Sequence, residues 1–451
     1  MSGSDAAALR EELRRLCVRH RVPGAQLAVH HAGVTVTVEH GVRSLADGDP
    51  VTALTAFPVG SVTKVFTAVL TLVLIEDGEL GLDEPLAAHL PGFGVGEKVT
   101  VRQLLSHTAG LASAVAEPEP GAAYTRSHWL REHTREGDLV HSPGTVFSYS
   151  NAGYVVAGAL VEKVTGMDWR EAVGAIVLEP LGIEPSFVTG RPAASARPVA
   201  AGHTVRHGRD RIVAVPEQAL HPVEDPDGGL AVSAADLVAF AGLLADAGRA
   251  AAPLGPATVA EMCRDQLGGV RAGPAGMADG WGLGLARYTD GAGRDRYGHD
   301  GTLDGVSCHL RFDPADGTAV ALTTNANTGA QLWDELSEHL AGAGLPAGNG
   351  TGTAALFAAP EAPPPDDCLG TYVNGPTTLT VERASDGLLR LASEGSPAYA
   401  LTCRTGGFSL HDLDGGPALF VGRFLCDAAT GRTDGLQFSG RLACRVRQAD
   451  G

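Results

Sequence analysis

The sequence predicts an α+β protein with two domains. The larger domain combines an antiparallel sheet flanked by helices with an all-helical region, and the smaller one is an antiparallel β domain. With 451 residues, the chain is longer than a single hydrophobic core supports. Alternating strand patterns occur near both ends of residues 1–345, and helical periodicity recurs between them. After a stretch rich in Pro and Gly, residues 368–451 contain short strand-like runs.

The elements of the larger domain are predicted from their periodicity. A helix at residues 6–20 has Leu and Cys residues on one face. Strands at 25–31 and 34–40 follow as a hairpin around Ala32-Gly33. The later elements are a helix at 62–76, a helix at 237–245 after a capping-box-like start at 233–236, strands at 307–313 and 318–325, and a closing helix at 333–343.

A change of composition marks the second domain. Residues 346–367 are rich in Gly, Ala, Pro and Thr, which is typical of a linker. Short strand-like runs then alternate with Gly-containing turns, and this spacing predicts a small antiparallel barrel or sandwich. The predicted strands are 377–382, 388–392, 398–403, 407–410, 418–425 and 435–447.

Composition and charge exclude several functions. Hydrophobic residues make up 44% of the chain and charged residues 19%, as in packed globular proteins. The formal charge of −18 argues against a nucleic-acid partner and against an anionic membrane surface. We find no signal-peptide core and no apolar run near the ~20 residues that span a membrane, so a cytoplasmic location is expected. The seven cysteines form no C-x-x-C cluster, which fits buried reduced thiols and predicts no metal site.

The first chemical motif is Ser61-Val-Thr-Lys64, an S-x-x-K at a predicted helix start. Residues three apart share a helix face, and the N-terminus of a helix favours a developing oxyanion. A lysine in a partly dry pocket can have its pKa lowered enough to activate a serine hydroxyl. Taken alone, the motif also fits a helix cap followed by a surface lysine, although apolar residues surround Lys64.

The second motif is Tyr149-Ser-Asn151. In an extended segment, residues two apart point the same way. The phenol can relay a proton to a leaving group, and the amide of Asn151 can orient Lys64 and the substrate. By itself the pattern fits an ordinary loop with a half-buried tyrosine better.

The third motif is His299-Asp-Gly301, just before the predicted strand at 307–313. A glycine lets a substrate backbone approach closely, and a histidine can donate to an acyl oxygen or share proton transfer. The chain has sixteen histidines, so a single one is weak evidence. His107 is interpreted as structural, bonded to loop carbonyls.

The order of the three motifs resembles the serine β-lactamase and penicillin-binding-protein superfamily, in particular its class C and D-aminopeptidase branch. Residues 104–111, 143–158 and 228–236 also resemble stretches of that branch. The resemblance covers residues 1–345 and implies a β-lactamase-like catalytic domain. The catalytic residues that it implies are Ser61 as nucleophile with Lys64, Tyr149, Asn151 and His299.

The resemblance also implies an oxyanion hole and a substrate site. The backbone N–H groups of Ser61 and Thr302 form the expected oxyanion hole. Gly229 and Leu230 are expected to line the acyl pocket, although a helix-entry loop is the alternative. His299 stands where β-lactamases usually have a lysine. This departure speaks against β-lactam hydrolysis and fits esterase, peptidase and acyltransferase members.

A cytoplasmic chain with a small C-terminal β domain resembles the penicillin-binding-protein-type thioesterases of nonribosomal peptide assembly lines. Those are free-standing peptide cyclases with a lipocalin-like C-terminal domain. The resemblance implies a catalytic domain at 1–345, a linker at 346–367 and a lipocalin-like β domain at 368–451. The implied substrate is a peptidyl thioester with a D-configured C-terminal residue, delivered by a carrier protein and released as a macrocycle. No cofactor is implied.

The substrate-binding residues are predicted as Gly229, Leu230, Gly301 and Arg441. Arg441, in the last predicted strand, can reach the active site and hold a peptide carboxylate as a bidentate partner. Arg441 fits a solvated barrel residue at least as well. Arg445 and Arg447 are close alternatives for the arginine that holds the carboxylate.

Other functions stay open at this point. The first is a cytoplasmic esterase, D-aminopeptidase or carboxamide transacylase of the same fold. The second, from another class, is a ligand-binding or sensor protein without turnover. Ser61, Lys64 and Tyr149 together argue against a purely binding role.

Overall fold

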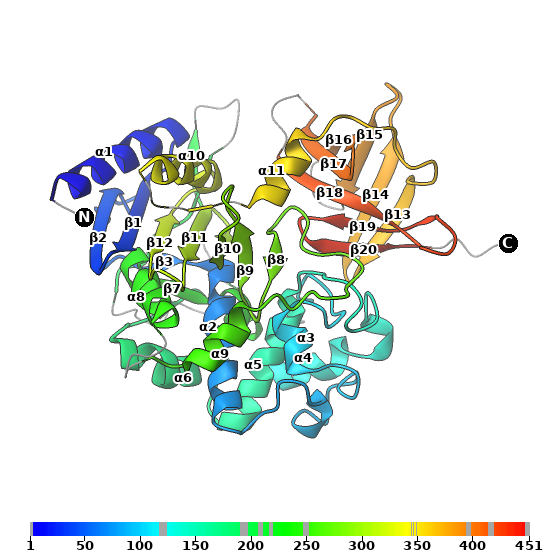
Figure 1. Cartoon of the computed structure of the whole chain (residues 1–451), viewed down its shortest axis with the longest axis horizontal. Coiled ribbons are helices and arrows are strands. Elements are labelled where there is room, and N and C mark those ends of the chain that lie inside the picture. The colour runs from blue at the N-terminus through cyan, green and yellow to red at the C-terminus, as the bar shows by residue number, and fades with distance from the viewer. Residues whose placement is uncertain are drawn as a thin grey trace.

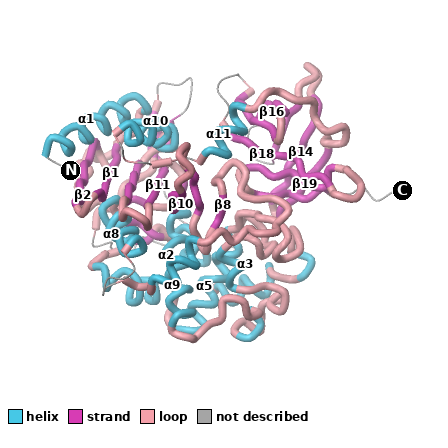
Figure 2. The backbone as a smooth tube through the Cα atoms, in the orientation of Figure 1, coloured by secondary structure: helices cyan, strands magenta, loops and turns pink. Residues whose placement is uncertain are grey.

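A computed structural model describes residues 3–116, 124–189, 197–205, 211–215, 220–246, 252–343, 345, 347–348, 350–393, 398–413 and 419–446. They form a large body with a central sheet and helices, and a barrel beside it (Figure 1). Figure 2 shows that helices lie on both sides of the central sheet, whereas strands make up the wall of the barrel.

The central sheet is antiparallel and brings the two ends of the larger domain together. Ala25 of β1 pairs with Thr324 of β12, so the first strand lies against the last. The two predicted hairpins are confirmed, and three further strands that the sequence reading missed extend the sheet. In spatial order the strands are β2 (Val34–Gly41), β1 (Gly24–His31), β12 (Ala319–Thr324), β11 (Val306–Phe312), β10 (Asp295–Leu303), β9 (Ala286–Thr289) and β8 (Gly280–Trp281).

Helices cover both faces of this sheet. On one face, α1 (Gly3–His20) and α10 (Gly329–Gly342) pack together, and Leu13 and Leu336 are fully buried between them and the strands. On the other face lies α8 (Ala234–Ala245), which begins with the predicted capping box of Ser233 and Asp236. The predicted helices at both ends of the domain are therefore confirmed (Figure 1).

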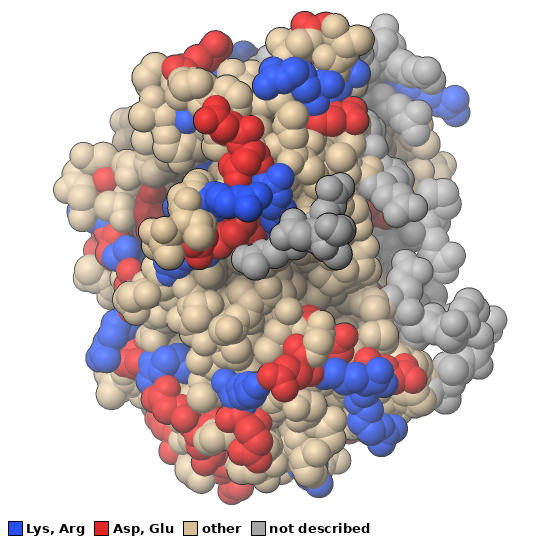
Figure 3. Space-filling model, turned by 90° about the vertical axis from the view of Figure 1, so that its right-hand side faces the viewer, with Lys and Arg blue, Asp and Glu red and all other residues tan. Residues whose placement is uncertain are grey.

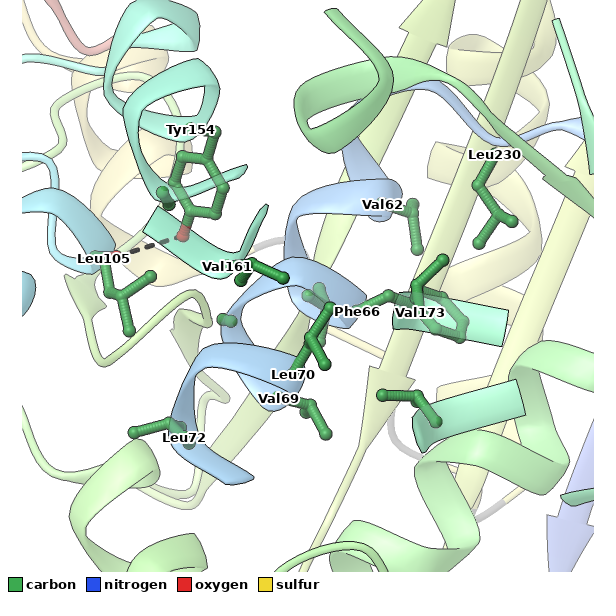
Figure 4. Packing of buried hydrophobic residues seen from close by; sticks show 14 of the residues in the cluster. Val62, Phe66, Val69, Leu70, Leu72, Leu105, Tyr154, Val161, Val173 and Leu230 are labelled. Carbon is green, nitrogen blue, oxygen red and sulfur yellow. Dashed lines mark hydrogen bonds between the residues drawn. The ribbon is translucent and has the colours of Figure 1, made fainter. Parts of the chain in front are cut away.

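The helical region is built around α2 (Thr63–Glu76), whose side chains are mostly buried. Figure 4 shows Val62, Phe66 and Leu70 packed among side chains from neighbouring elements. Tyr154 donates from its hydroxyl to the carbonyl of Leu105 at 3.2 Å in the same core. The other α-helices of the larger domain in the described residues are α3 (Val101–Leu105), α4 (Arg126–His133), α5 (Asn151–Thr165), α6 (Trp169–Val173), α7 (Asp225–Gly228) and α9 (Pro256–Cys263).

The second domain is a closed antiparallel barrel in which each strand pairs with the next. Val373 of the first strand pairs with Cys444 of the last, which closes the barrel and leaves no strand edge unpaired. The predicted fold class is confirmed. The strands are β13 (Gly370–Asn374), β14 (Thr377–Arg383), β15 (Leu389–Ser393), β16 (Tyr399–Arg404), β17 (Gly407–Asp412), β18 (Phe420–Cys426), β19 (Thr433–Phe438) and β20 (Arg441–Arg445).

Three details of this region differ from the sequence reading. The first barrel strand, β13, was not predicted. The single strand expected at 435–447 is two strands, because Ser439 and Gly440 adopt φ values of 45° and 70° and reverse the chain. The expected linker contains the helix α11 (Thr351–Ala358), which contacts β17 and β18.

Charges of both signs share the surface. On the face shown in Figure 3, Lys and Arg lie next to Asp and Glu, with uncharged surface between the clusters. Among the described residues, no helix is both long and apolar enough to cross a bilayer. Within the same residues, no three His, Cys, Asp or Glu side chains are grouped as metal ligands.

Candidate active site

Ser61 lies in a 3₁₀ turn, Gly60–Val62, that leads directly into α2. This turn is pressed against β10. A Cβ atom on Gly60 would lie 2.5 Å from the carbonyl oxygen of Thr302, and one on Gly301 would lie 1.9 Å from that of Val59. Only glycine fits at these contacts. The two glycines therefore bring the Ser61 turn against Thr302, the two residues predicted to form the oxyanion hole.

Lys64 is fully buried, which excludes the surface-lysine alternative. Its Nζ atom donates to Ser61 Oγ at 3.2 Å and to the backbone carbonyl of Asp227 at 2.7 Å. The same Nζ lies 3.6 Å from Asp227 Oδ2 and 5.2 Å from the centre of the Tyr149 ring. A buried ammonium is stable only when paired in this way.

Asp227, at the end of α7, is a site residue that the sequence reading missed. Burial raises the pKa of its carboxyl group to about 6, while the positive charge of Lys64 acts in the opposite direction. The nearby Asp225 is paired with Arg126 at 3.0 Å and with Arg170 at 3.1 Å. Asp227 is thus the carboxyl group of this loop that contacts Lys64.

The signal for Asp227 was present in the sequence. It directly precedes residues 228–236, a stretch that the family resemblance marked, but only Gly229 and Leu230 were singled out there. Its partner Lys64 is 163 residues away in the chain, so periodicity could not connect the two.

Tyr149 and His299 meet next to this pair. The Tyr149 hydroxyl lies 3.5 Å from His299 Nε2, and His299 Nδ1 lies 2.6 Å from the carbonyl oxygen of Asp300. Burial, with the positive charge of Lys64, lowers the pKa of His299 to about 4. The imidazole is therefore neutral at pH 7. Its Nδ1–H donates to the carbonyl of Asp300, which leaves Nε2 as an acceptor for the tyrosine hydroxyl.

The rings of His107 and Trp281 pack against the ring of Tyr149. The ring of His107 lies 4.3 Å from that of Tyr149 and 5.1 Å from that of Trp281, between centroids. The prediction that His107 bonds loop carbonyls is wrong, because its Nδ1 accepts from the backbone N–H of Ser150 at 3.1 Å. Burial keeps the pKa of His107 well below its usual range, so this nitrogen stays free to accept.

Asn151 occupies a different setting from the one predicted. It is the first residue of α5, with Ser150 as the N-cap, so the expected extended segment ends before it. Its Oδ1 is buried and has no hydrogen-bond partner among the described residues, and the expected bond to Lys64 is not formed there. An unpartnered amide oxygen beside Tyr149 is a candidate acceptor for a substrate N–H.

Gly229 and Leu230 contact the nucleophile turn. The backbone carbonyl of Leu230 accepts from Val59 N–H at 3.0 Å, and its N–H donates to Thr63 Oγ1 at 3.2 Å. Its side chain is fully buried near Val62 (Figure 4). In this structure Leu230 therefore supports the turn that carries Ser61 and does not line an open acyl pocket. Gly229 is likewise buried beside Asp225.

Arg441 reaches the active site from the barrel. Its guanidinium carbon lies 4.8 Å from the centre of the Tyr149 ring, and its Nη1 donates to the carbonyl of Ser439 at 3.1 Å. Burial lowers the pKa of Arg441. Arg445 instead bonds the carbonyl of Leu369 within the barrel, and Arg447 lies outside the described residues. Of the two arginines that are described, Arg441 is the one at the site.

Comparison with known proteins agrees with this geometry. A family model described as Beta-lactamase matches residues 6–345. Penicillin-binding protein 4 of Amycolatopsis lactamdurans is 35% identical over 384 residues, which cover 82% of this chain and 97% of that protein. Esterase EstB of Burkholderia gladioli is 32% identical over 71% of this chain and 91% of its own length.

A solved structure matches the chain along nearly its whole length. The crystal structure of SurE covers 98% of this chain and 99% of its own, with a TM-score of 0.84 and 37% identity. A second crystal structure, of SurE with D-Leu, gives a TM-score of 0.83. The matched residues contain the Ser61 turn, the Tyr149 segment and β10. The chain therefore belongs to the beta-lactamase family, within the serine hydrolases related to penicillin-binding proteins.

Proposed function

We propose that this protein is a stand-alone serine acyltransferase that accepts a peptidyl thioester on Ser61 and releases the peptide as a macrocycle in nonribosomal peptide biosynthesis. The observation that supports the proposal is that side chains from the catalytic domain and from the barrel lie together at one site. Ser61, Lys64 and Asp227 come from the catalytic domain, and Arg441 reaches the adjacent Tyr149 from the barrel. A site closed by a second domain suits a large substrate that must be shielded from water.

In the first step, the proton shared by the Lys64–Asp227 pair lies on Asp227, so that Lys64 is neutral. Ser61 Oγ attacks the thioester carbonyl and its proton passes to Lys64 Nζ, 3.2 Å away. The Ser61–carbonyl bond forms, and the oxyanion lies between the backbone N–H groups of Ser61 and Thr302. The C–S bond then breaks, and the sulfur takes the hydroxyl proton of Tyr149, which the proton from Lys64 replaces. Burial raises the pKa of Asp227 to about 6, which allows its carboxyl group to share a proton with Lys64.

Tyr149 delivers and removes protons in this proposal. Before the reaction its hydroxyl faces Nε2 of neutral His299, which can accept from it, and when the C–S bond breaks it gives its proton to the leaving sulfur instead. In the release step an amine of the same peptide attacks the ester on Ser61, its proton passes through Tyr149, and Ser61 regains its hydroxyl hydrogen. No cofactor takes part in this sequence.

A cavity of about 520 Å³ lies between the catalytic domain and the barrel, but none of Ser61, Tyr149 and Arg441 lines it. Ala152, next to Asn151, lines it on one side, and Val373 and Cys444 of the barrel line it on the other. The proposal therefore rests on the acyl-enzyme itself: a peptide that folds back at Ser61 holds its amine near the ester. Effective molarities of ~10⁵ M or more then allow the amine to compete with ~55 M water.

A D-configured residue at the acylating position is part of the proposal. SurE, which is similar to this chain over its full length, has been solved with D-Leu. Delivery of the peptide by a carrier protein and a cytoplasmic location remain proposals from the family resemblance.

Matched substrates test the proposed function. Pantetheine thioesters of one peptide, ending in a D- or an L-residue, are incubated with the protein and the products are identified by mass spectrometry. We expect a cyclic product, lighter than the linear acid by one water, and a clear preference for the D-epimer. Linear acid as the sole product would favour a hydrolase, and equal use of both epimers would remove the D-residue claim.

The second candidate function is an esterase or amidase of the same fold. Esterase EstB of Burkholderia gladioli is similar to the chain over most of its length, which favours this candidate. The same product analysis separates the two, because an esterase transfers the acyl group to water.

A further inference from the structure

The segment Phe147–Asn151, which carries Tyr149, is buried except for the half-buried Asn151, so its backbone N–H groups need acceptors. Four of the five N–H groups have acceptors in the catalytic domain. Phe147 N donates to the carbonyl of Ala272, and the N–H groups of Ser148 and Ser150 donate to the carbonyl and to Nδ1 of His107. Asn151 N donates to the carbonyl of Ser113 at 3.0 Å. The remaining N–H, that of Tyr149 itself, donates 3.0 Å to the carbonyl of Gly440 in the barrel.

The turn that offers this carbonyl is fitted to the segment. Ser439 and Gly440 both have positive φ, as required at the centre of a tight two-residue hairpin turn. A Cβ atom on Gly440 would lie 2.3 Å from Met277 Sδ and 3.2 Å from Phe147 Cε1, so a side chain has no room there. The hairpin β19–β20 therefore packs its turn directly onto the Tyr149 segment.

Two further contacts from the same hairpin hold the segment. Gln437, which is fully buried in β19, donates from Nε2 to the carbonyls of Phe147 and Gly273, each at 2.9 Å. Its Oε1 accepts from Arg423 Nε at 2.8 Å, which fixes the orientation of the amide. Leu442 N–H donates to Ser148 Oγ at 3.2 Å.

We propose that the β19–β20 hairpin is a structural part of the active site and that Gln437 is a positioning residue for Tyr149. The hairpin supplies bonds to three consecutive residues, 147, 148 and 149, so the barrel fixes the place of the phenol. The inference rests on the proposed function in one respect, the proton role of Tyr149. It goes beyond a wall that excludes water, because a barrel side chain that bonds the backbone next to Tyr149 is expected to affect the rate.

The test uses the full chain with Gln437→Met and Gln437→Glu. Methionine keeps the length of the side chain without its hydrogen bonds, whereas glutamate keeps the acceptor for Arg423 and loses both donors. Ser409→Ala is the matched control, because Ser409 is equally buried in the barrel and its hydroxyl bonds Arg404 and His411. With a pantetheine peptide thioester, both Gln437 variants should lower kcat roughly tenfold, since small misplacement of a reacting group is costly. KM should change less than twofold, and Ser409→Ala should keep the native kcat.

A double-mutant cycle identifies the route of the effect. In a Tyr149→Phe background, Gln437→Met should lower kcat less than twofold further, because the group that it positions is already gone. A tenfold loss repeated in that background would overturn the inference, as would native kcat in both Gln437 variants or an equal loss in Ser409→Ala. Native kcat in Tyr149→Phe alone would instead overturn the proton role that the proposed function gives to Tyr149. Circular dichroism melting of each variant shows that folded protein is compared.

Discussion

Ser61 and Lys64 are held by the catalytic domain, whereas Tyr149 is held jointly by the catalytic domain and the barrel. Lys64 contacts the Ser61 turn, the helix α7 that carries Asp227, and the rings of Tyr149 and Tyr154. Tyr149 instead gives its N–H to Gly440 of the barrel and lies under Arg441. The nucleophile is thus built within one domain, and the proton relay is built between two.

Because Tyr149 is held by contacts from both domains, removing the barrel would change the active site and not only its exposure to water. A chain that ends before the barrel loses the acceptor of Tyr149 N–H and the bonds from Gln437 and Leu442. Such a truncation changes the active site itself, so its loss of cyclisation would not measure water exclusion alone. Point variants at the nucleophile pair, Ser61 and Lys64, and at the Tyr149 relay separate activation of the nucleophile from proton relay.

The largest effect on kcat is expected when the partner of the nucleophile, Lys64, is replaced. Lys64→Ala removes the base that lies 3.2 Å from Ser61 Oγ, and should lower kcat roughly 10³-fold, within the range of general acid–base catalysis. Steady-state kinetics on a peptide thioester measures this. Lys64→Ala with near-native kcat would mean that another group takes the proton.

Replacing the proton relay, Tyr149, should lower kcat less. Tyr149→Phe keeps the ring that packs on His107 and removes the hydroxyl near His299, so a loss of roughly 10²-fold is expected. The loss should be larger for an amide than for a thioester, because an amine leaving group needs a proton more. Equal losses on both substrates would place Tyr149 outside leaving-group protonation.

The two arginines of β20, Arg441 and Arg445, should behave differently. Arg441→Ala removes the cation over Tyr149 and should lower kcat/KM roughly tenfold, with partial rescue in Arg441→Lys. Arg445→Ala is the matched control, since Arg445 bonds a barrel carbonyl and should change kcat/KM less than twofold. The reverse ranking would show that the carboxylate site lies elsewhere.

The smallest effect at neutral pH concerns Asp227. Its pKa is raised to about 6 by burial, so it takes up a proton as the pH falls through that value and the Lys64–Asp227 pair then carries one proton too many. kcat/KM should therefore fall below pH about 6. His299, whose pKa is about 4, titrates at lower pH and does not mask this limb.

Asp227→Asn should remove the inflection near pH 6 and keep the backbone carbonyl that accepts from Lys64. Profiles of kcat/KM from pH 4.5 to 8.5 for both proteins are compared. An unchanged inflection in the variant would assign it to another group.

The sequence predicted those parts of the site that depend on local spacing. Ser61 and Lys64 meet because three residues separate them in a helical turn, and Gly301 is needed because the turn before Ser61 packs on its strand. The contact between Lys64 and Asp227, in contrast, depends on how α7 packs on α2. Packing of that kind leaves no periodic signal in either segment.

The same reason explains the errors in the fold. The helix α11 lies in a segment whose Ala-rich core favours a helix, but its Gly and Pro flanks are typical of a linker. The split between β19 and β20 depends on Ser439-Gly440, a two-residue turn of a type that the strand-like pattern around it concealed. The position of Arg441 over Tyr149 follows from that turn. From the sequence alone, Arg441 and Arg445 were comparable candidates for the substrate-binding arginine.

The claim that Ser61 forms the acyl-enzyme is tested most directly by trapping it. The protein is incubated with a slowly released acyl thioester or a fluorophosphonate, digested and analysed by mass spectrometry. We predict a single mass increment on the peptide that contains Ser61, and none in Ser61→Ala. An increment on another residue, or full thioesterase activity in Ser61→Ala, would contradict the account.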